Sequence, residues 1–317
     1  MRTSASSPIG TFLHSMRDYE RIAVERSLVA RYKHLSQLGA VQIVLANRLQ
    51  DCKALVRKLE WDSNFFGLNI GKLEFFEFGP SASNVILVDT IVKEAKPHLD
   101  QQLAELGIDH LSVQVDTKDV VSLQVFQGLG FKIMDTIACY VLDLRPVPVS
   151  TKSGLPISDA VDLDIEKMKK IAGECFADIS VNANRFNSDP FIPLDKTLEM
   201  YQAWATKSVS GELADATLVY KDAEDLKGFI TISKPSKFDS DNGMKLFSIP
   251  LNAVDVRHHN KGVYQSLVSE AIKRAALMGA EWLEIRTQLS NQAVHRVWQK
   301  MGAKLVLSYH TCRLMKD

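Results

Sequence analysis

The sequence predicts an α/β (α+β) protein with two similar domains in tandem. Two observations carry this prediction: a strand-helix-strand pattern occurs once in each half, and an apolar strand in the last quarter runs through a glycine into a helix. The chain has 317 residues, of which 46% are hydrophobic. Because a domain commonly holds about 100–200 residues, this length is sufficient for two hydrophobic cores.

Composition excludes several classes of protein. Lys and Arg number 38 and Asp and Glu number 38, so the formal net charge is zero and no general field attracts nucleic acid. The start of the chain lacks a basic segment followed by an apolar run, and no later run approaches the roughly 20 apolar residues that span a bilayer. We therefore expect a cytoplasmic protein with no nucleic-acid partner and no membrane insertion.

The cysteines and histidines form no ligand pattern. The four cysteines are far apart and include no CxxC pair, which predicts reduced, mostly buried thiols and no disulfide. No HExxH motif is present, so we expect no bound metal. The histidines expected at the surface or at helix caps include His98, His110, His258 and His295.

The segment from Asp18 to Leu59 places apolar residues at roughly helical spacing among charges. It predicts one or two amphipathic helices, with residues 1–48 as a helical N-terminal extension. Such helices are compatible with a homodimer or a docking arm. The alternative is an extension that packs on its own domain.

An internal repeat relates the two halves without a gap. Gly130 and Gly302 differ by 172 positions, and the same shift relates six further identical pairs. The sequence pattern of each copy predicts a strand, a helix, a glycine C-cap and a second strand. Because the identical pairs agree with this shared order, we infer a duplication. The predicted ranges are 111–115, 120–129 and 132–144 in the first copy, and 283–287, 292–301 and 304–314 in the second. A turn-rich connector from Pro146 to Pro156 separates domains at residues 50–148 and 155–317.

The loop after the apolar strand 251–256 has the composition of a diphosphate site. Gly262 permits close approach of the backbone, and the helix after it presents unpaired N–H groups at its positive end. Lys261 and Arg257 can add positive charge. A single glycine before a helix is also an ordinary turn. The first half has Gly79-Pro80-Ser81 instead of a basic glycine loop, so we expect it to be a degenerate copy.

This order of elements resembles the GNAT superfamily of N-acetyltransferases, and within it the TDP-fucosamine acetyltransferase family, which acetylates the 4-amino group of a nucleotide-linked deoxysugar. The chain is similar to a tandem pair of such domains, each with a mixed, mostly antiparallel sheet flanked by helices. The blocks that carry the resemblance are Leu59-Glu60-Trp61-Asp62-Ser63-Asn64-Phe65-Phe66-Gly67, Asn184-Arg185-Phe186 with Tyr201 and Trp204, and Thr287-Gln288 with Asn291 and Gly302. In the first and most specific block, we expect Trp61, Phe65 and Phe66 mostly in the core.

The resemblance implies acetyl-CoA as the acyl donor. The residues that it assigns to the cofactor are Ala253, Val254 and Val256, through backbone hydrogen bonds to pantetheine, and His259, Lys261, Gly262, Val263 and Asn291. His259 stands where the superfamily has Arg or Gln, and Tyr264 where it has Gly or Ala. Asn291 is also an ordinary helix N-cap.

On the acceptor side, the resemblance implies a nucleotide amino sugar. The guanidinium of Arg185 can donate two parallel hydrogen bonds to a phosphate. The ring of Phe186, Tyr201 or Trp204 can stack on a base or on a sugar face. The alternative is a surface arginine beside core aromatic residues.

The reaction implied is direct attack of a neutral amine on the thioester, whose leaving thiolate needs a proton or a hydrogen bond. The superfamily commonly has a tyrosine for this on the helix after Asn291, and Trp298 stands at that position. An indole N–H donates a hydrogen bond but no proton near neutral pH. The proton could instead come from Tyr264, Tyr309, His310 or solvent, and Trp298 could be a plain core residue.

The sequence thus predicts an acyl-CoA-dependent N-acetyltransferase for a nucleotide amino sugar in surface-polysaccharide biosynthesis. One alternative is a GNAT enzyme for another small amine. A second alternative is a catalytically silent module that binds acyl-CoA or a nucleotide sugar.

Overall fold

The structure, a computed structural model, describes residues 21–46, 52–77, 85–146, 156–177, 179, 182–223 and 225–316. The amino-terminal residues 1–20, the turn at 79–81 and the connector 147–155 lie outside the described residues. Contacts divide the chain into two units. Unit 1 holds Met1–Ile137 and Val306–Asp317, and unit 2 holds Ala138–Leu305.

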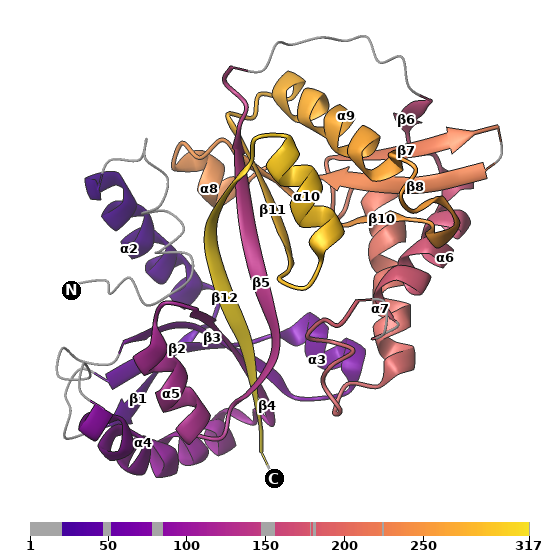
Figure 1. The fold of residues 1–317 in the computed structure, drawn as a ribbon. Coiled ribbons are helices and arrows are strands. Elements are labelled where there is room, and N and C mark those ends of the chain that lie inside the picture. The colour runs from indigo at the N-terminus through magenta and orange to yellow at the C-terminus, as the bar shows by residue number, and fades with distance from the viewer. Residues whose placement is uncertain are drawn as a thin grey trace. The chain divides into compact units, whose positions relative to one another are not determined.

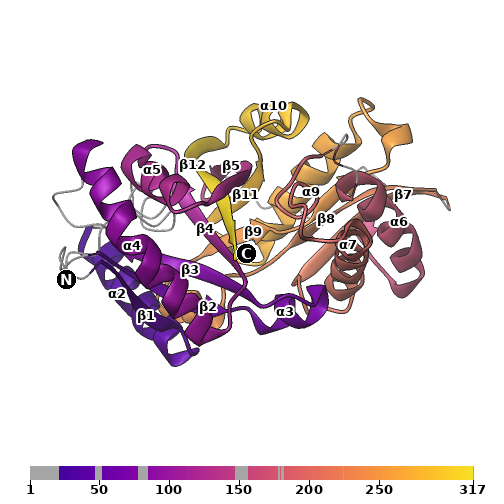
Figure 2. The ribbon, with the colours of Figure 1, turned by 90° about the horizontal axis from the view of Figure 1, so that it is seen from below.

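Unit 1 contains a mixed sheet with the strand order β1-β2-β3-β4-β12 (Figure 1), in which β3 and β4 are parallel and the other pairs antiparallel. Helices α4 and α5 cover one face (Figure 2), where Leu111, Val113 and Phe126 are fully buried. The elements are α2 Arg21–Gln37, β1 Val41–Ala46, β2 Cys52–Lys58, α3 Glu60–Phe66, β3 Ile70–Glu77, α4 Val85–Leu106, β4 His110–Asp116, α5 Val120–Gly128, the first part of β5 Lys132–Asp143 and most of β12 Lys304–Met315.

The sequence predicts helices between Asp18 and Leu59. This prediction is confirmed for α2 and wrong for the residues that follow α2. Residues 41–46 and 52–58 are the antiparallel strands β1 and β2. Short apolar runs fit a helix and a buried strand about equally well by periodicity, and the β-branched residues Val41 and Ile43 favour the strand. In α3, the predicted core position is confirmed for Phe66, which is 6% exposed, and wrong for Trp61, which is 41% exposed.

Unit 2 contains an antiparallel sheet with the order β10-β8-β7-β6, and β9 pairs in parallel with β11. Helix α9 packs on β7 and β8, and α6 and α7 pack side by side (Figure 1). None of the described helices is long and apolar enough to cross a bilayer. The elements are β6 Ile157–Asp159, α6 Ile165–Phe176, α7 Leu194–Val209, β7 Ala216–Asp222, β8 Asp225–Ile232, α8 Lys237–Asp241, β9 Leu246–Ile249, β10 Asn252–Val254, α9 Val263–Leu277, β11 Trp282–Gln288 and α10 Gln292–Lys300.

The repeat is confirmed element by element, because β4, α5 and β5 have the same bounds as β11, α10 and β12 after a shift of 172 positions. Gly130 and Gly302 follow the matching helices at φ of 100° and 88°, a conformation that glycine adopts without strain.

The last strand of each copy belongs wholly or partly to the unit formed by the other half of the sequence. Residues 306–317 belong to unit 1, where β12 is antiparallel to β4, whereas residues 138–143 of β5 belong to unit 2. The two units therefore differ from the linear domains 50–148 and 155–317, because Cys312 and Leu314 of β12 belong to the core of unit 1, whereas Ala138 and Leu142 of β5 belong to the core of unit 2.

Candidate functional site

The path of β9 and β10 is interrupted at Pro250 and Leu251. Before the interruption β9 pairs with β11, and after it β10 pairs with β8 instead. Thr231 fixes the break, since its Oγ1 donates to the Leu251 carbonyl at 2.8 Å and accepts from the Leu251 N–H at 2.9 Å. The pairing of β11 with β9 ends at Ile285, so β10 is the edge strand of its sheet.

The backbone groups of β10 alternate between β8 and the open edge. Leu251 O and Asp255 N each form a hydrogen bond of 2.9 Å to the backbone of β8. Ala253 lies midway between them and pairs with β8, so its N–H and C=O face β8. The N–H and C=O of Val254 therefore face the open edge. Both residues are predicted to bind a cofactor through their backbone. The geometry is compatible with this role for Val254. It is not compatible with it for Ala253, because the backbone groups of Ala253 face β8.

The Val254 carbonyl meets two side chains at this edge. His259 Nε2 lies 2.9 Å from the oxygen and Cys175 Sγ lies 3.4 Å from it. A carbonyl oxygen only accepts, so both side chains donate, and His259 carries its proton on Nε2. Burial raises the pKa of the Cys175 thiol to about 11, which keeps that thiol protonated at neutral pH.

The turn between β10 and α9 is held by ion pairs. The Asp255 carboxylate accepts from the backbone N–H of Arg257 at 2.8 Å and pairs with its guanidinium at 2.6 Å, and this hydrogen bonding lowers the pKa of Asp255. Asp225 binds His258 at 3.0 Å and lies 3.6 Å from Arg257. Because Arg257 is neutralised by carboxylates, the charge expected from it at the loop is reduced. Lys261 is exposed and donates to the Arg257 carbonyl at 2.8 Å.

The amino end of α9 has no side-chain cap. Gly262 is the N-cap residue at φ 79°, and the first bond within the helix runs from the Ser266 N–H to the Gly262 carbonyl. The N–H groups of residues 263–265 thus have no hydrogen-bond partner within the described part of the chain. Helices α10 and α5, by contrast, are capped by Asn291 and Asp119. The start of α9 therefore has N–H donors available for an anion, and among the described helices α3, α6 and α7 also lack a side-chain cap.

The two residues predicted to take part in catalysis lie in contact. Trp298 Nε1, on α10, donates to Tyr264 Oη, on α9, at 3.0 Å. Trp298 is fully buried, and burial raises the pKa of Tyr264, so the phenol keeps its proton at neutral pH. The other predicted donors, Tyr309 and His310, lie on β12 within unit 1, where His310 Nδ1 is bonded to Thr136 Oγ1 at 2.9 Å.

A buried network around His295 is absent from the sequence prediction. His295 is 7% exposed, with Nδ1 3.0 Å from Tyr140 Oη and Nε2 within hydrogen-bond distance of the carbonyls of residues 288–289. Gln299 Nε2 completes this hydrogen-bond network by donating to Tyr140 Oη at 3.2 Å. The prediction that placed His295 and His110 at the surface or at helix caps is wrong for the surface, since both are buried, with His110 5% exposed. The spacing of His295 and Gln299 on one helix face was the signal that could have indicated this network.

The residues predicted to bind the acceptor also lie together. The Arg185 guanidinium carbon is 4.5 Å from the Phe186 ring centroid. The rings of Phe186, Tyr201 and Trp204 pack edge to face with centroids 5.4–6.2 Å apart, and Phe176 stacks on Tyr201 at 4.7 Å. Phe186 and Tyr201 are 7% and 6% exposed, so their faces are occupied by neighbouring rings. Arg185 and Trp204, which are partly exposed, are the members that a ligand could reach.

No protein-family profile and no curated protein matches the sequence, but solved structures do. A GCN5-related N-acetyltransferase from Sphaerobacter thermophilus has a TM-score of 0.51 at 15% identity over 83% of this chain and 76% of that one. A second, from Kribbella flavida, has a TM-score of 0.50 at 11% identity over 90% and 94%. A glucosamine N-acetyltransferase region of a fungal multi-domain GH3 β-N-acetylglucosaminidase has a TM-score of 0.51 at 11% identity over 83% and 31%. The chain has the GNAT fold.

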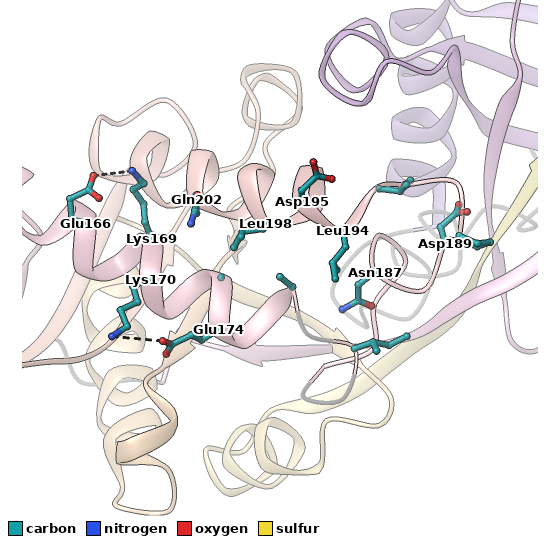
Figure 3. A pocket seen from close by; sticks show the side chains of 15 residues that line it. Glu166, Lys169, Lys170, Glu174, Asn187, Asp189, Leu194, Asp195, Leu198 and Gln202 are labelled. Carbon is teal, nitrogen blue, oxygen red and sulfur yellow. Dashed lines mark hydrogen bonds and ion pairs between the residues drawn. The ribbon is translucent and has the colours of Figure 1, made fainter.

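Unit 2 also has a groove between α6, α7 and the loop that joins them, with a volume of about 1090 Å³ (Figure 3). Along α6, Lys169 pairs with Glu166 at 2.9 Å and Lys170 with Glu174 at 3.9 Å. None of the residues predicted from the sequence for the cofactor or the acceptor lines it. Within the described ranges, no group of His, Cys, Asp or Glu is placed to hold a metal ion.

Proposed function

We propose that the chain is an acyl-CoA-dependent N-acetyltransferase with acetyl-CoA as the acyl donor, bound by unit 2. The observation that supports this most directly is the succession of an open edge strand, a glycine loop and an uncapped helix. An edge strand can pair with the extended amides of a pantetheine arm as it would with a peptide. The free N–H groups after Gly262, with the charge of Lys261 nearby, suit a diphosphate.

The residues present fit this cofactor. Val254 offers its backbone N–H on the open edge, where its C=O accepts from His259 and Cys175. No atom lies within 4 Å of the place where a Cβ at Gly262 would stand. Val263 begins α9 with an unpaired N–H, and the exposed Val256 lies two residues after the end of β10. Asn291 uses Oδ1 to cap α10, so its Nδ2 remains as a donor to the cofactor arm.

For the chemistry, the bound acetyl-CoA supplies an acetyl thioester that a neutral amine attacks. As the amide forms the C–S bond breaks, and we assign the proton for the leaving sulfur to Tyr264 Oη, which stays protonated at neutral pH. The proton that the amine nitrogen loses then restores the phenol. Trp298 is the positioning residue, because its N–H binds the phenol oxygen and leaves the phenol hydrogen directed elsewhere. The buried His295 network holds the turn between β11 and α10, and so supports the helix that carries Trp298.

For the acceptor, we propose the amino group of a nucleotide-linked amino sugar used in surface-polysaccharide biosynthesis. Arg185, held over Phe186, is the residue for a phosphate, and Trp204 supplies an accessible ring. Phe186 and Tyr201 act by packing, which fixes the loop that carries Arg185. The fold also occurs in a glucosamine N-acetyltransferase region, so an amino-sugar acceptor is compatible with it.

The test is thiol release by the purified protein from acetyl-CoA, with a TDP-amino sugar and with a panel of other amines. Release only with the amino sugar is the expected outcome. Release with a different amine would favour a GNAT enzyme for that amine, and binding of acetyl-CoA without release for any amine would favour a silent module. Absence of acetyl-CoA binding in calorimetry would contradict the assignment of the cofactor.

A further inference from the structure

The carbonyl oxygen of Val254 already has a full set of hydrogen bonds. It lies on the open edge of β10, yet it accepts from His259 Nε2 at 2.9 Å and is 3.4 Å from Cys175 Sγ. A carbonyl oxygen has two lone pairs, so a further donor must replace one of these two. An amide N–H that adds to the edge of β10 therefore competes with a side chain of the protein itself.

The two side chains differ in how easily they can be replaced. Cys175 belongs to α6, which packs on β8 and β10, and its position is set by that packing. His259 is exposed and follows the short turn 256–258. Its bond to Val254 is the only hydrogen bond of its ring within the described residues. His259 is thus the partner that a ligand displaces.

We propose that the imidazole of His259 and an amide of the pantetheine arm compete for the Val254 carbonyl. This inference rests on the proposed function, because it takes pantetheine as the extended ligand of β10. His259 then weakens binding of the arm while leaving the nucleotide part of the cofactor unaffected. If His259 instead bound the cofactor directly, it would strengthen binding of acetyl-CoA, and its removal would lower the affinity.

The test compares acetyl-CoA with 3′-phosphoadenosine 5′-diphosphate, which is the nucleotide part of the same molecule without the arm. The ratio of the two dissociation constants, measured by calorimetry, isolates the contribution of the arm. In His259→Ala this ratio should favour acetyl-CoA by about two- to twelve-fold more than in the wild type, which is the range for one neutral hydrogen bond. Binding of the nucleotide alone should not change.

His258→Ala is the matched control, because His258 is the adjacent histidine and pairs with Asp225 at 3.0 Å rather than with Val254. Its ratio should equal that of the wild type. A second measurement uses wild-type protein with ¹⁵N-labelled histidine. The Nε2 resonance of His259 should shift on addition of acetyl-CoA and remain in place with the nucleotide alone.

The outcomes separate this inference from the function on which it rests. In one outcome, acetyl-CoA binds more tightly than the nucleotide, but His259→Ala leaves the preference for acetyl-CoA unchanged or reduces it. The proposed competition is then wrong and the cofactor assignment stands. An Nε2 resonance that does not respond to acetyl-CoA leads to the same conclusion. If the wild type binds neither molecule, both the competition and the proposed function are wrong.

Discussion

Trp298 Nε1 donates a hydrogen bond of 3.0 Å to the phenol oxygen of Tyr264, which joins α10 to α9. The phenol is the acceptor in this bond, so its own hydrogen is free for a different partner. The indole is fully buried and cannot move without a change in the core. This pair therefore presents a fixed hydroxyl group from α9, although the resemblance had directed attention to α10.

Tyr264→Phe should lower kcat for thiol release by about a hundred-fold, within the range of general acid catalysis, and leave acetyl-CoA affinity nearly unchanged because the ring packing is kept. Trp298→Phe should lower kcat less, by about ten-fold, because it only releases the phenol from its position. Steady-state kinetics with both substrates varied would measure this. The double variant should be no slower than Tyr264→Phe, and a further loss would mean that Trp298 acts independently.

Gly262→Ala should weaken acetyl-CoA binding by about ten-fold. The added Cβ meets no atom within 4 Å, so the cost is conformational: φ is 79°, where an L side chain is strained by about 1–2 kcal/mol. Relief of this strain would turn the N–H groups of α9 away from the loop. Gly211→Ala is the matched control, with φ of 83° and no neighbour within 4 Å. Calorimetry and thermal unfolding should show a similar loss of stability in both variants and a loss of affinity in Gly262→Ala alone.

Arg185→Lys should raise the KM for the nucleotide amino sugar by about ten-fold without changing the KM for acetyl-CoA. Lysine keeps the charge but loses the planar fork and the stacking on Phe186. Arg145 is a suitable control, because its guanidinium is likewise placed over a ring, that of Trp282, at 4.4 Å. An equal change of KM in Arg145→Lys would show that loss of stacking, rather than loss of a phosphate contact, causes the effect.

Asp255→Asn should destabilise the protein at neutral pH and matter less in acid. Hydrogen bonding to Arg257 lowers the pKa of Asp255 below its unfolded value of about 3.9, so the contribution of the carboxylate is present above that value. It is lost as the pH falls through the lower pKa of the folded state. Urea unfolding from about pH 7 to about pH 3 should show the difference between wild type and variant shrinking below about pH 4. A constant difference at all pH values would argue against this ion pair.

Tyr140→Phe should lower the free energy of unfolding by about 1–3 kcal/mol, the cost of leaving a buried polar group without its partner. The change removes the hydroxyl that lies between His295 Nδ1 and Gln299 Nε2. Tyr220→Phe is the control, since the Tyr220 ring contacts Lys227 at 5.5 Å by its face. Denaturant unfolding should separate the two variants, and equal stability would mean that the His295 network contributes little.

Much of the fold could be predicted from local patterns. The six elements of the repeat were placed within about one residue, because apolar periodicity and the glycine after each helix define them locally. The strands β1 and β2 were missed, because short apolar runs do not distinguish strand from helix until a partner strand is known. The orientation of Val254 could not be predicted either, since the interruption at Pro250 and Leu251 is defined by a bond to Thr231.

The sequence by itself determined the duplicated strand-helix-strand units and the glycine before α9, because helix ends, strand alternation and a positive φ depend on a few neighbouring residues. Only the tertiary structure decided that β12 joins unit 1, that the backbone of Ala253 faces β8, and that Trp298 meets Tyr264. These contacts join residues that are far apart along the chain. Their partners are selected by the packing of whole elements, which no short stretch of sequence encodes.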